Sequence, residues 1–370
     1  MRVGILTGGG DCPGLNAVIR SVAKSLMLQC DAEVIGIEEG FLGLIERRTR
    51  TLSYRDVSGI LARGGTILGT HNKANPFSYY RRDDEDVSEE VVAYCEELGL
   101  DAVVALGGDG TMSICHRLEK VGLNMVGVPK TIDNDIVQTD RTFGFDTAVS
   151  IATDAVDRLQ TTGQAHQRVM ILETMGRYAG WIALHAGVAG GADVILIPEL
   201  PFTVDEVARV IKEREDRQRF TIICVAEGAR AQGGEMVVKE RVEESHDPVR
   251  LGGVANWLKE ELKPLVDSEI RTVILGHIQR GGSPTPYDRV LATNFGMMAA
   301  SLVAKERFGR MVAIQDSHLT SVPFEEVADK TRTVPENAMA ILSAFSVGTS
   351  FGVPGMEFDP SMVPGEKPVS

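Results

Sequence analysis

The sequence lacks any apolar run of transmembrane length, and no signal-peptide pattern precedes its first strand-like segment at residues 2–6. Its five cysteines are odd in number and scattered, with no Cys-x-x-Cys pair. Neither a disulfide framework nor a zinc site is therefore indicated. We expect a soluble, cytoplasmic protein whose thiols are reduced and mostly buried.

Positive charge is also scarce, because 38 Lys and Arg against 52 Asp and Glu give a formal net charge of −14. This balance argues against nucleic acid and anionic membranes as partners, so an anionic substrate must be held by cations gathered locally. Four arginines lie near Gly or His in apolar strand-and-turn contexts: Arg168, Arg177, Arg271 and Arg280. A surface salt bridge explains any one of them, so only their grouping is informative.

What the 370 residues do contain is a repeated alternation of strand-like and helix-like segments. Strands are expected at 3–7, 33–37, 101–106, 124–128, 168–172, 194–197, 220–225 and from 271 onward. Helices are expected at about 17–27, 83–98, 112–120, 143–159, 178–188, 204–219 and 288–307, with a surface loop at about 233–248. The alternation predicts an α/β fold of two similar doubly wound domains with mainly parallel sheets and an active-site cleft between them.

The most informative stretch is residues 129–136, Pro-Lys-Thr-Ile-Asp-Asn-Asp-Ile, which follows a short apolar run. A buried strand ending there would deliver Asp133 and Asp135 to the carboxyl edge of a parallel sheet, where open α/β sheets bind ligands. At two-residue spacing in an extended segment, both side chains point the same way. One suits a base and the other a ligand for a metal or hydroxyl. Taken alone, the stretch also fits a turn whose Asp and Asn side chains bond their own backbone.

Two glycine-rich loops, at residues 8–16 and 107–111, each follow an expected strand and precede an expected helix. In such loops the backbone can approach phosphate oxygens and free N–H groups point at them. The first loop fits no standard phosphate motif, so a tight strand-to-helix turn explains it equally well. The second contains Asp109, a carboxylate suited to Mg²⁺ bound to phosphates. A further Gly/Thr loop at 63–73 carries cations, and the set favours a phosphate site.

The turn at 276–284 contains His277 and Arg280 flanked by glycines. An arginine supplies fixed charge and a histidine a second donor, which suits a phosphate monoester. The alternative is a strand-end histidine satisfied by local hydrogen bonds.

In combination these residues resemble the bacterial 6-phosphofructokinase family, in order over about residues 1–310. The matching stretches are 7–16, 63–69, 107–111, 129–136, 166–168, 175–178, 190–193 and 276–289. The resemblance implies a glycolytic kinase that transfers a phosphoryl group from ATP-Mg to the 1-hydroxyl of fructose 6-phosphate, giving fructose 1,6-bisphosphate. We expect a donor-binding domain of 1–140 plus about 255–310 and a sugar-phosphate domain of 141–254 plus about 311–345, because the loop at 276 must meet the same cleft. The Gly/Pro-containing tail from 346 to 370 is expected to be a surface arm or disordered.

The resemblance also implies roles for single residues. Asp133 is the expected base, Thr131 and Asp135 orient the hydroxyl or the metal, and Arg177 stabilises the transferring phosphoryl group. Asp109 is the expected Mg²⁺ ligand. The other donor contacts are expected from Gly10, Gly110, Thr111, Lys73 and Lys130. The other sugar-phosphate contacts are expected from Met175, Gly176, Glu227, His277 and Arg280, with Arg168 and Arg271 reaching in from a neighbouring subunit of a homodimer or homotetramer.

Two positions bear on the phosphoryl donor. In this family, an acidic residue at the place of Gly110 together with a lysine at the place of Lys130 accompanies pyrophosphate use. Only the lysine is present here. Glycine leaves room for the nucleotide's α-phosphate, so we favour ATP, with pyrophosphate as the alternative. An arginine expected after the 64–69 loop is missing, and Lys73 stands in its neighbourhood as a point charge and not a bidentate fork.

The regulatory nucleotide site of the family is depleted in this chain. Arg20, Lys24 and Asp193 match it, whereas Gln160, Asp216 and Gln218 stand where cations are expected. We therefore expect weak or absent regulation by ADP and phosphoenolpyruvate.

Two competing interpretations remain. NAD kinases and diacylglycerol-type lipid kinases share only the Gly-Gly-Asp-Gly-Thr segment and leave 131–135, 175–177 and 276–280 unexplained. A non-catalytic paralogue that binds sugar phosphate would be free to lose Asp133, Asp109 or Arg177, yet all three are present.

Overall fold

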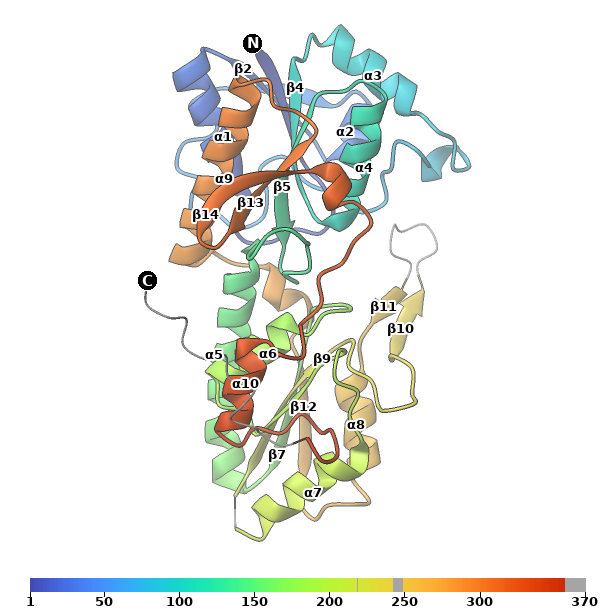
Figure 1. Ribbon diagram of the computed structural model, residues 1–370, viewed down its shortest axis with the longest axis vertical. Helices are drawn as coiled ribbons and strands as arrows, with labels where there is room; N and C mark the ends of the chain where they lie inside the picture. Colours follow the sequence, from blue (N-terminus) through green and yellow to red (C-terminus); the bar gives the residue numbers. More distant parts are fainter. Residues whose placement is uncertain (218, 242–248, 357–370) are drawn as a thin grey trace, which may run out of the picture. The chain divides into compact units, whose positions relative to one another are not determined.

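The computed structural model describes residues 1–217, 219–241 and 249–356, which form two compact units (Figure 1). The described part of the first unit comprises 1–147 and 280–332. That of the second comprises 148–217, 219–241, 249–279 and 333–356. No helix in these residues is long and apolar enough to cross a membrane.

The first unit is built on a mainly parallel sheet. Its strands are β1 (Arg2–Thr7), β2 (Glu33–Ile37), β3 (Thr49–Leu52), β4 (Ala102–Gly107), β5 (Met125–Thr131), β13 (Arg310–Gln315) and β14 (His318–Pro323), with β6 (Phe143–Gly144) beside β5. They lie in the order β14-β13-β5-β4-β1-β2-β3. Only β3 and β14 run antiparallel to their neighbours, so β1, β4 and β5 end at one edge of the sheet.

Helices cover both faces of this sheet. They are α1 (Leu15–Cys30), α2 (Phe41–Ile45), α3 (Ser88–Glu97), α4 (Asp109–Lys120) and α9 (Pro286–Ala304). Short 3₁₀ turns are η1 (Tyr80–Arg82) and η3 (Phe324–Glu326). In Figure 1, α1 and α9 lie on one face and α2, α3 and α4 on the other. The strands between them are buried on both sides; all six residues of β4 are buried.

The second unit has a smaller, wholly parallel sheet in the order β12-β7-β9-β8. Its strands are β7 (Val169–Thr174), β8 (Val194–Leu196), β9 (Thr221–Ala226) and β12 (Ile270–Ile274). A separate antiparallel pair comprises β10 (Val238–Arg241) and β11 (Val249–Leu251). The helices are α5 (Phe145–His166), α6 (Trp181–Ala189), α7 (Val204–Glu215), α8 (Val254–Leu262) and α10 (Met339–Ser346), and η2 (Gly276–Arg280) follows β12. One apolar core joins α7 and α8 to the sheet.

The expected α/β architecture with mainly parallel sheets is confirmed, but several boundaries differ. The chain returns to the first unit at residue 280 and not at about 255, and it stays there to 332 and not 310. The reason is that β13 pairs in parallel with β5 and carries β14 with it. The sequence analysis assigned neither strand, nor α8 and α10.

Other boundaries have local causes. The helix expected from residue 83 begins at Ser88, because Asp83 and Asp84 adopt positive φ angles of 47° and 60°. The helix expected to reach residue 219 ends at Glu215. Of the expected 233–248 loop, residues 233–237 are irregular as expected, residues 238–241 form β10, and residues 242–248 lie outside the described residues. The expected tail is also ordered at its start: Ser350 forms a bridge with Val194, and Phe351 is 1% exposed. Residues 357–370 lie outside the described part.

Candidate active site

In the first unit, the two glycine loops meet at the edge where β1, β4 and β5 end. The backbone N–H of Gly8 donates to the Leu106 carbonyl at 2.8 Å, which ties the first loop to β4. Thr111, in the first turn of α4, is 6% exposed. A methyl group built at Gly8 would lie 2.8 Å from its hydroxyl, so the two loops are in close contact. The structure thus brings Gly10 and the 109–111 turn to one edge, as parallel strands require.

Two cations reach the first loop from other segments. The Lys130 ammonium, on β5, donates to the Gly10 carbonyl, and Lys130 is 3% exposed. The Arg280 guanidinium donates to the Asp11 carbonyl at 3.1 Å. A Cβ at Gly10 would lie 2.8 Å from this guanidinium, so glycine permits the approach. Three residues expected to bind phosphates are therefore neighbours.

Asp133 lies in the loop directly after β5. Its carboxylate is almost fully buried, with the residue 3% exposed, and Oδ1 has no hydrogen bond within the described part of the chain. Its backbone N–H donates to the Thr131 hydroxyl at 3.0 Å. The Thr131 hydroxyl therefore stabilises this turn. The Asp133 carboxylate does not, so the alternative in which an Asp side chain bonds its own backbone is wrong for Asp133.

Asn134 and Thr142 fix the rest of this loop. Asn134 has a φ of 53°, and its side-chain oxygen accepts from the Thr142 N–H at 3.1 Å. The Thr142 hydroxyl donates to the Thr131 carbonyl at 2.8 Å. Asp135 is 7% exposed, and its carbonyl accepts from the Arg332 N–H at 2.7 Å. These bonds make Asp133 a preorganised acid on a rigid turn.

Asp109 and Gly110 open α4, with Gly108 at the N-cap. Asp109 is partly exposed, and its carboxylate makes no hydrogen bond or ion pair with the residues that the structure describes. A carboxylate at a helix N-terminus beside backbone N–H groups is a position where phosphate and a divalent cation can share ligands. Across the described residues no group of three or more His, Cys, Asp or Glu side chains could hold a metal by itself. The geometry thus fits a cation held by one acid and by phosphate oxygens.

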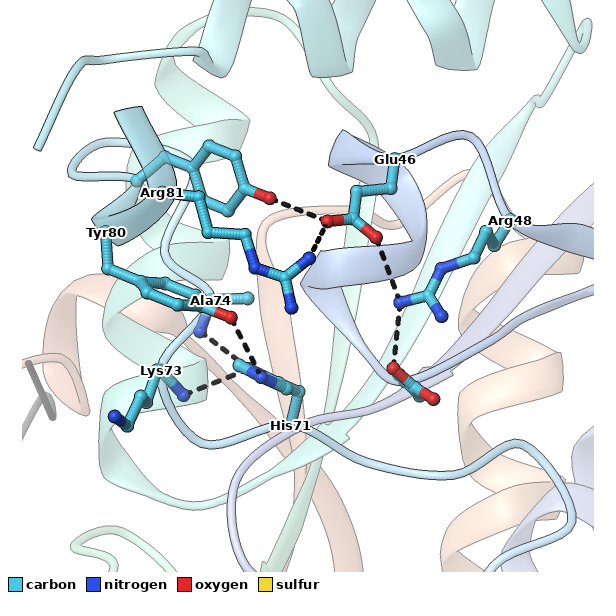
Figure 2. Close-up of polar contacts among 9 residues, drawn as sticks. Glu46, Arg48, His71, Lys73, Ala74, Tyr80 and Arg81 are labelled. Carbon is cyan, nitrogen blue, oxygen red and sulfur yellow. Dashed lines mark hydrogen bonds and ion pairs between the residues drawn. The ribbon is translucent and has the colours of Figure 1, made fainter. Parts of the chain in front are cut away.

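Lys73 lies in the loop that continues from the 63–70 segment. The Thr70 hydroxyl donates to the Gly9 carbonyl at 2.5 Å, which anchors this loop to the first glycine loop. The Lys73 ammonium is 5.9 Å from the centroid of the Tyr80 ring, and Figure 2 shows both beside His71. The loop therefore starts at the same edge of the sheet as Gly10.

In the second unit, the loops after β7 and β9 meet. The Arg177 N–H donates to the Glu227 carboxylate at 3.0 Å, and Arg177 has a φ of 50°. The Met175 N–H donates to the Gln279 side chain at 2.8 Å. Gly176 has a φ of 141°, and a Cβ there would lie 2.6 Å from the Ala179 carbonyl. Four residues expected at the sugar thus lie in neighbouring loops, and Gln279 contacts the first of them, Met175.

Gln279 lies in η2 between two other expected contacts. It is fully buried, and its Nε2 has no hydrogen bond among the described residues. His277 and Arg280 lie in the same short helix, and His277 is exposed. Sequence analysis missed Gln279, although it lies between two residues that were singled out.

Arg168 and Arg271 share one acid. Arg168 lies next to β7 and Arg271 lies on β12, and these strands are neighbours. The Glu269 carboxylate accepts from Arg168 Nε at 2.5 Å and also from Arg271 Nη2. Sequence analysis missed Glu269; the available signal was its position two residues before Arg271, since such residues lie on one side of an extended strand.

Comparison with known proteins gives the same family throughout. Residues 2–303 match the family model described as phosphofructokinase. The chain is 48% identical over 358 residues to ATP-dependent 6-phosphofructokinase 2 of Clostridium perfringens, covering 95% of this chain and 98% of that protein. It is 50% identical over 357 residues to ATP-dependent 6-phosphofructokinase of Chloroflexus aurantiacus, with the same two coverages.

A relative named for a different donor has a similar identity. The chain is 48% identical over 335 residues to the pyrophosphate–fructose 6-phosphate 1-phosphotransferase of Amycolatopsis methanolica, covering 90% of this chain and 96% of that protein. Among solved structures, phosphofructokinase of Pichia pastoris in the T-state matches with a TM-score of 0.77 and 29% identity, over 88% of this chain and 35% of that one. This chain thus spans about a third of the Pichia protein. With these matches, the chain belongs to the phosphofructokinase family.

Proposed function

We propose that this chain transfers the γ-phosphoryl group of ATP-Mg to the 1-hydroxyl of fructose 6-phosphate. The observation that carries this proposal is Asp133, a buried carboxylate with an unbonded oxygen on a turn fixed by Thr131. A carboxylate held in this way is suited to accept a hydroxyl proton as the phosphoryl group moves. The names of two relatives, both ATP-dependent 6-phosphofructokinases, support the same reaction.

Most of the catalysis is then positioning and charge neutralisation, as phosphoryl transfer requires. Lys130 meets the glycine loop at Gly10, where it adds positive charge near the donor phosphates. In the second unit, Arg177 is oriented through its backbone bond to Glu227 and supplies charge to the transferring group. Thr131 and Asp135 orient the acceptor hydroxyl.

Mg²⁺ is assigned to Asp109. The acid has no protein partner among the described residues and stands at the start of α4, beside Gly110 and Thr111. Mg²⁺ commonly binds through one or two carboxylates plus substrate phosphates, so a single acid suffices. When bound, the ion neutralises charge between the phosphates.

Fructose 6-phosphate is assigned mainly to the second unit. Met175, Gly176 and Glu227 contact the sugar, and His277 with Arg280 grips its 6-phosphate. Arg168 and Arg271 bind the phosphate of a neighbouring subunit's substrate, so the enzyme works as a homodimer or homotetramer. The Arg168–Glu269–Arg271 group beside the edge strand β12 supports this assignment, because Arg271 is exposed and Arg168 is partly exposed.

ATP is the proposed donor, and pyrophosphate is the second candidate. Lys130 is already bonded to the Gly10 carbonyl, which supports a role in holding the loop over a role specific to pyrophosphate. The 48% identity to the Amycolatopsis protein keeps pyrophosphate as the alternative.

The reaction is tested by following the product with ³¹P NMR. Fructose 6-phosphate, Mg²⁺ and ATP should give a second phosphate monoester on the sugar together with ADP. An analogue without the 1-hydroxyl should bind but give no product. Binding of fructose 6-phosphate without product from ATP or pyrophosphate would indicate the non-catalytic paralogue and contradict the proposal.

A further inference from the structure

His71 closes a turn in the loop that contains Lys73. Its Nδ1 accepts from the backbone N–H of Lys73 at 3.2 Å and of Ala74 at 3.0 Å (Figure 2). Its Nε2 is 3.4 Å from the Tyr80 hydroxyl, and the two rings stack with centroids 5.7 Å apart. A nitrogen that accepts two hydrogen bonds carries no proton, so this geometry requires the neutral imidazole with its proton on Nε2.

The charges around His71 largely offset one another. Arg48 is bonded to Glu39 at 2.8 Å, and Arg81 is bonded to Glu46. Burial lowers the pKa of His71 below its ordinary value, Glu39 and Glu46 oppose that shift, and Arg81 and Arg48 add to it. Burial is the largest cause, so the imidazole stays neutral at pH values where an exposed histidine begins to protonate.

The same turn is tied to the glycine loop. Thr70 directly precedes His71, and its hydroxyl donates to the Gly9 carbonyl. Lys73 follows His71 by two residues, and Figure 2 shows its side chain pointing away from the imidazole. The turn closed by His71 therefore sets where the Lys73 ammonium lies relative to the first glycine loop.

We propose that His71 is a positioning residue for the phosphoryl donor, a magnesium-bound nucleoside triphosphate. The neutral imidazole closes the turn that presents Lys73 to the donor phosphates, and a proton on Nδ1 opens it and weakens donor binding. This inference rests on the proposed function, because it takes the donor to bind at the Gly10 loop.

The sign of the pH effect follows from this geometry. The donor binds the closed turn, so its affinity is high above the pKa of His71 and falls as pH drops through that value, which lies below the ordinary one. By linkage, bound donor must lower the pKa of His71 further. The sugar phosphate does not contact this loop in the proposed arrangement, so replacing His71 should leave the pH dependence of its binding unchanged.

The test replaces His71 with asparagine. The Asn oxygen can accept from the N–H groups of the following residues and does not titrate in this range. The half-saturating ATP concentration is measured between about pH 5 and 8 for the wild type, His71→Asn and His71→Ala. A matched control is His318→Asn, because His318 is exposed on β14 and, in the part of the chain that the structure describes, bonds only the Asp316 carbonyl.

We expect the wild type and His318→Asn to lose ATP affinity about tenfold toward the acid end, since two hydrogen bonds to the imidazole are lost. His71→Asn should match the wild type at the alkaline end and stay flat, whereas His71→Ala should bind ATP weakly throughout. An unchanged acid loss in His71→Asn would overturn the role of His71. No turnover by the wild type at the alkaline end would instead contradict the proposed function.

A second measurement does not depend on the variants. In protein labelled with ¹⁵N-histidine, His71 should carry its proton on Nε2 at the alkaline end, and the Lys73 and Ala74 amides should be protected from exchange. Protection should fall as His71 protonates. A proton on Nδ1 at the alkaline end would overturn the inference whether or not the variants fold.

Discussion

Asp133 differs from the other acids of the site in having a buried carboxylate oxygen that no described group satisfies. Buried polar atoms are nearly always bonded, and an exception costs folding free energy. Such a cost is expected where a residue is kept for chemistry and not for stability. The unbonded, buried oxygen of Asp133 is therefore the structural observation that supports its proposed role as the base.

Replacing Asp133 with serine should reduce turnover by about a hundredfold to ten-thousandfold, because the acceptor hydroxyl loses its base. Binding of fructose 6-phosphate, measured by calorimetry, should stay near the wild-type value. The melting temperature should hold or rise, since the variant buries no unbonded carboxylate. Asp157→Asn, an exposed change on α5, is the control and should alter none of these quantities. Full activity in Asp133→Ser would remove it from the role of base.

At the scale of elements, hydrogen bonds join the N-terminal turns of α5 and α9. Asp288, in the first turn of α9, accepts from the Thr147 N–H at 2.8 Å and from its hydroxyl at 2.5 Å. In return the Thr147 hydroxyl accepts from the Thr285 N–H at 3.0 Å. Burial is the main cause that raises the pKa of Asp288 to about 6. Thr285 caps α9 by accepting from the Asp288 N–H at 3.3 Å, but no local sequence pattern shows that Asp288 caps a second helix 141 residues away.

The raised pKa of Asp288 predicts how stability changes with pH. A carboxyl whose folded pKa exceeds its unfolded value stabilises the fold when protonated, and this contribution is lost as pH rises through about 6. Between about pH 5 and 8 the wild type should lose about 1 kcal/mol of unfolding free energy relative to Asp288→Asn. Urea denaturation at several pH values measures this difference. A difference independent of pH would mean that Asp288 is ionised throughout.

Glu269 joins the ends of two neighbouring strands by holding both Arg168 and Arg271. If these arginines bind a sugar phosphate, the carboxylate competes with it. Glu269→Gln should therefore lower the half-saturating concentration of fructose 6-phosphate severalfold, most clearly at low salt. Glu260→Gln on α8, an exposed change whose carboxylate is 4.0 Å from Lys263, is the matched control. A higher half-saturating concentration in Glu269→Gln would show that the acid orients the arginines.

The elements also show where sequence reasoning stops. The long apolar strands and the glycine loops were recognisable because burial on both faces and phosphate-type turns leave strong local patterns. The β13–β14 hairpin was missed: its turn uses Asp316 and Ser317 at φ angles of 49° and 66°, without the Asn-Gly or Asp-Gly pair that announces such turns. The contacts of Glu269 with Arg168 and of Gln279 with Met175 were missed because they join residues 101 and 104 positions apart. The contacts of His71 with the N–H groups of Lys73 and Ala74 are local, and they were missed because no turn was assigned there.

For the whole molecule, the central question is whether ATP or pyrophosphate is the phosphoryl donor. The relatives at 48–50% identity include proteins named for ATP and a protein named for pyrophosphate. Overall similarity therefore does not decide between the two donors. Two residues favour ATP: Gly110 at the start of α4, and Lys130, which is bonded to the Gly10 carbonyl. Glycine leaves space for a nucleotide, and the lysine already has a structural partner.

The most direct measurement is the initial rate with fructose 6-phosphate and Mg²⁺, with ATP and pyrophosphate compared in parallel at saturating sugar. The account predicts turnover with ATP and little or none with pyrophosphate, which would mean that Gly110 sets the donor. Turnover with pyrophosphate alone would contradict it and assign the choice to Lys130.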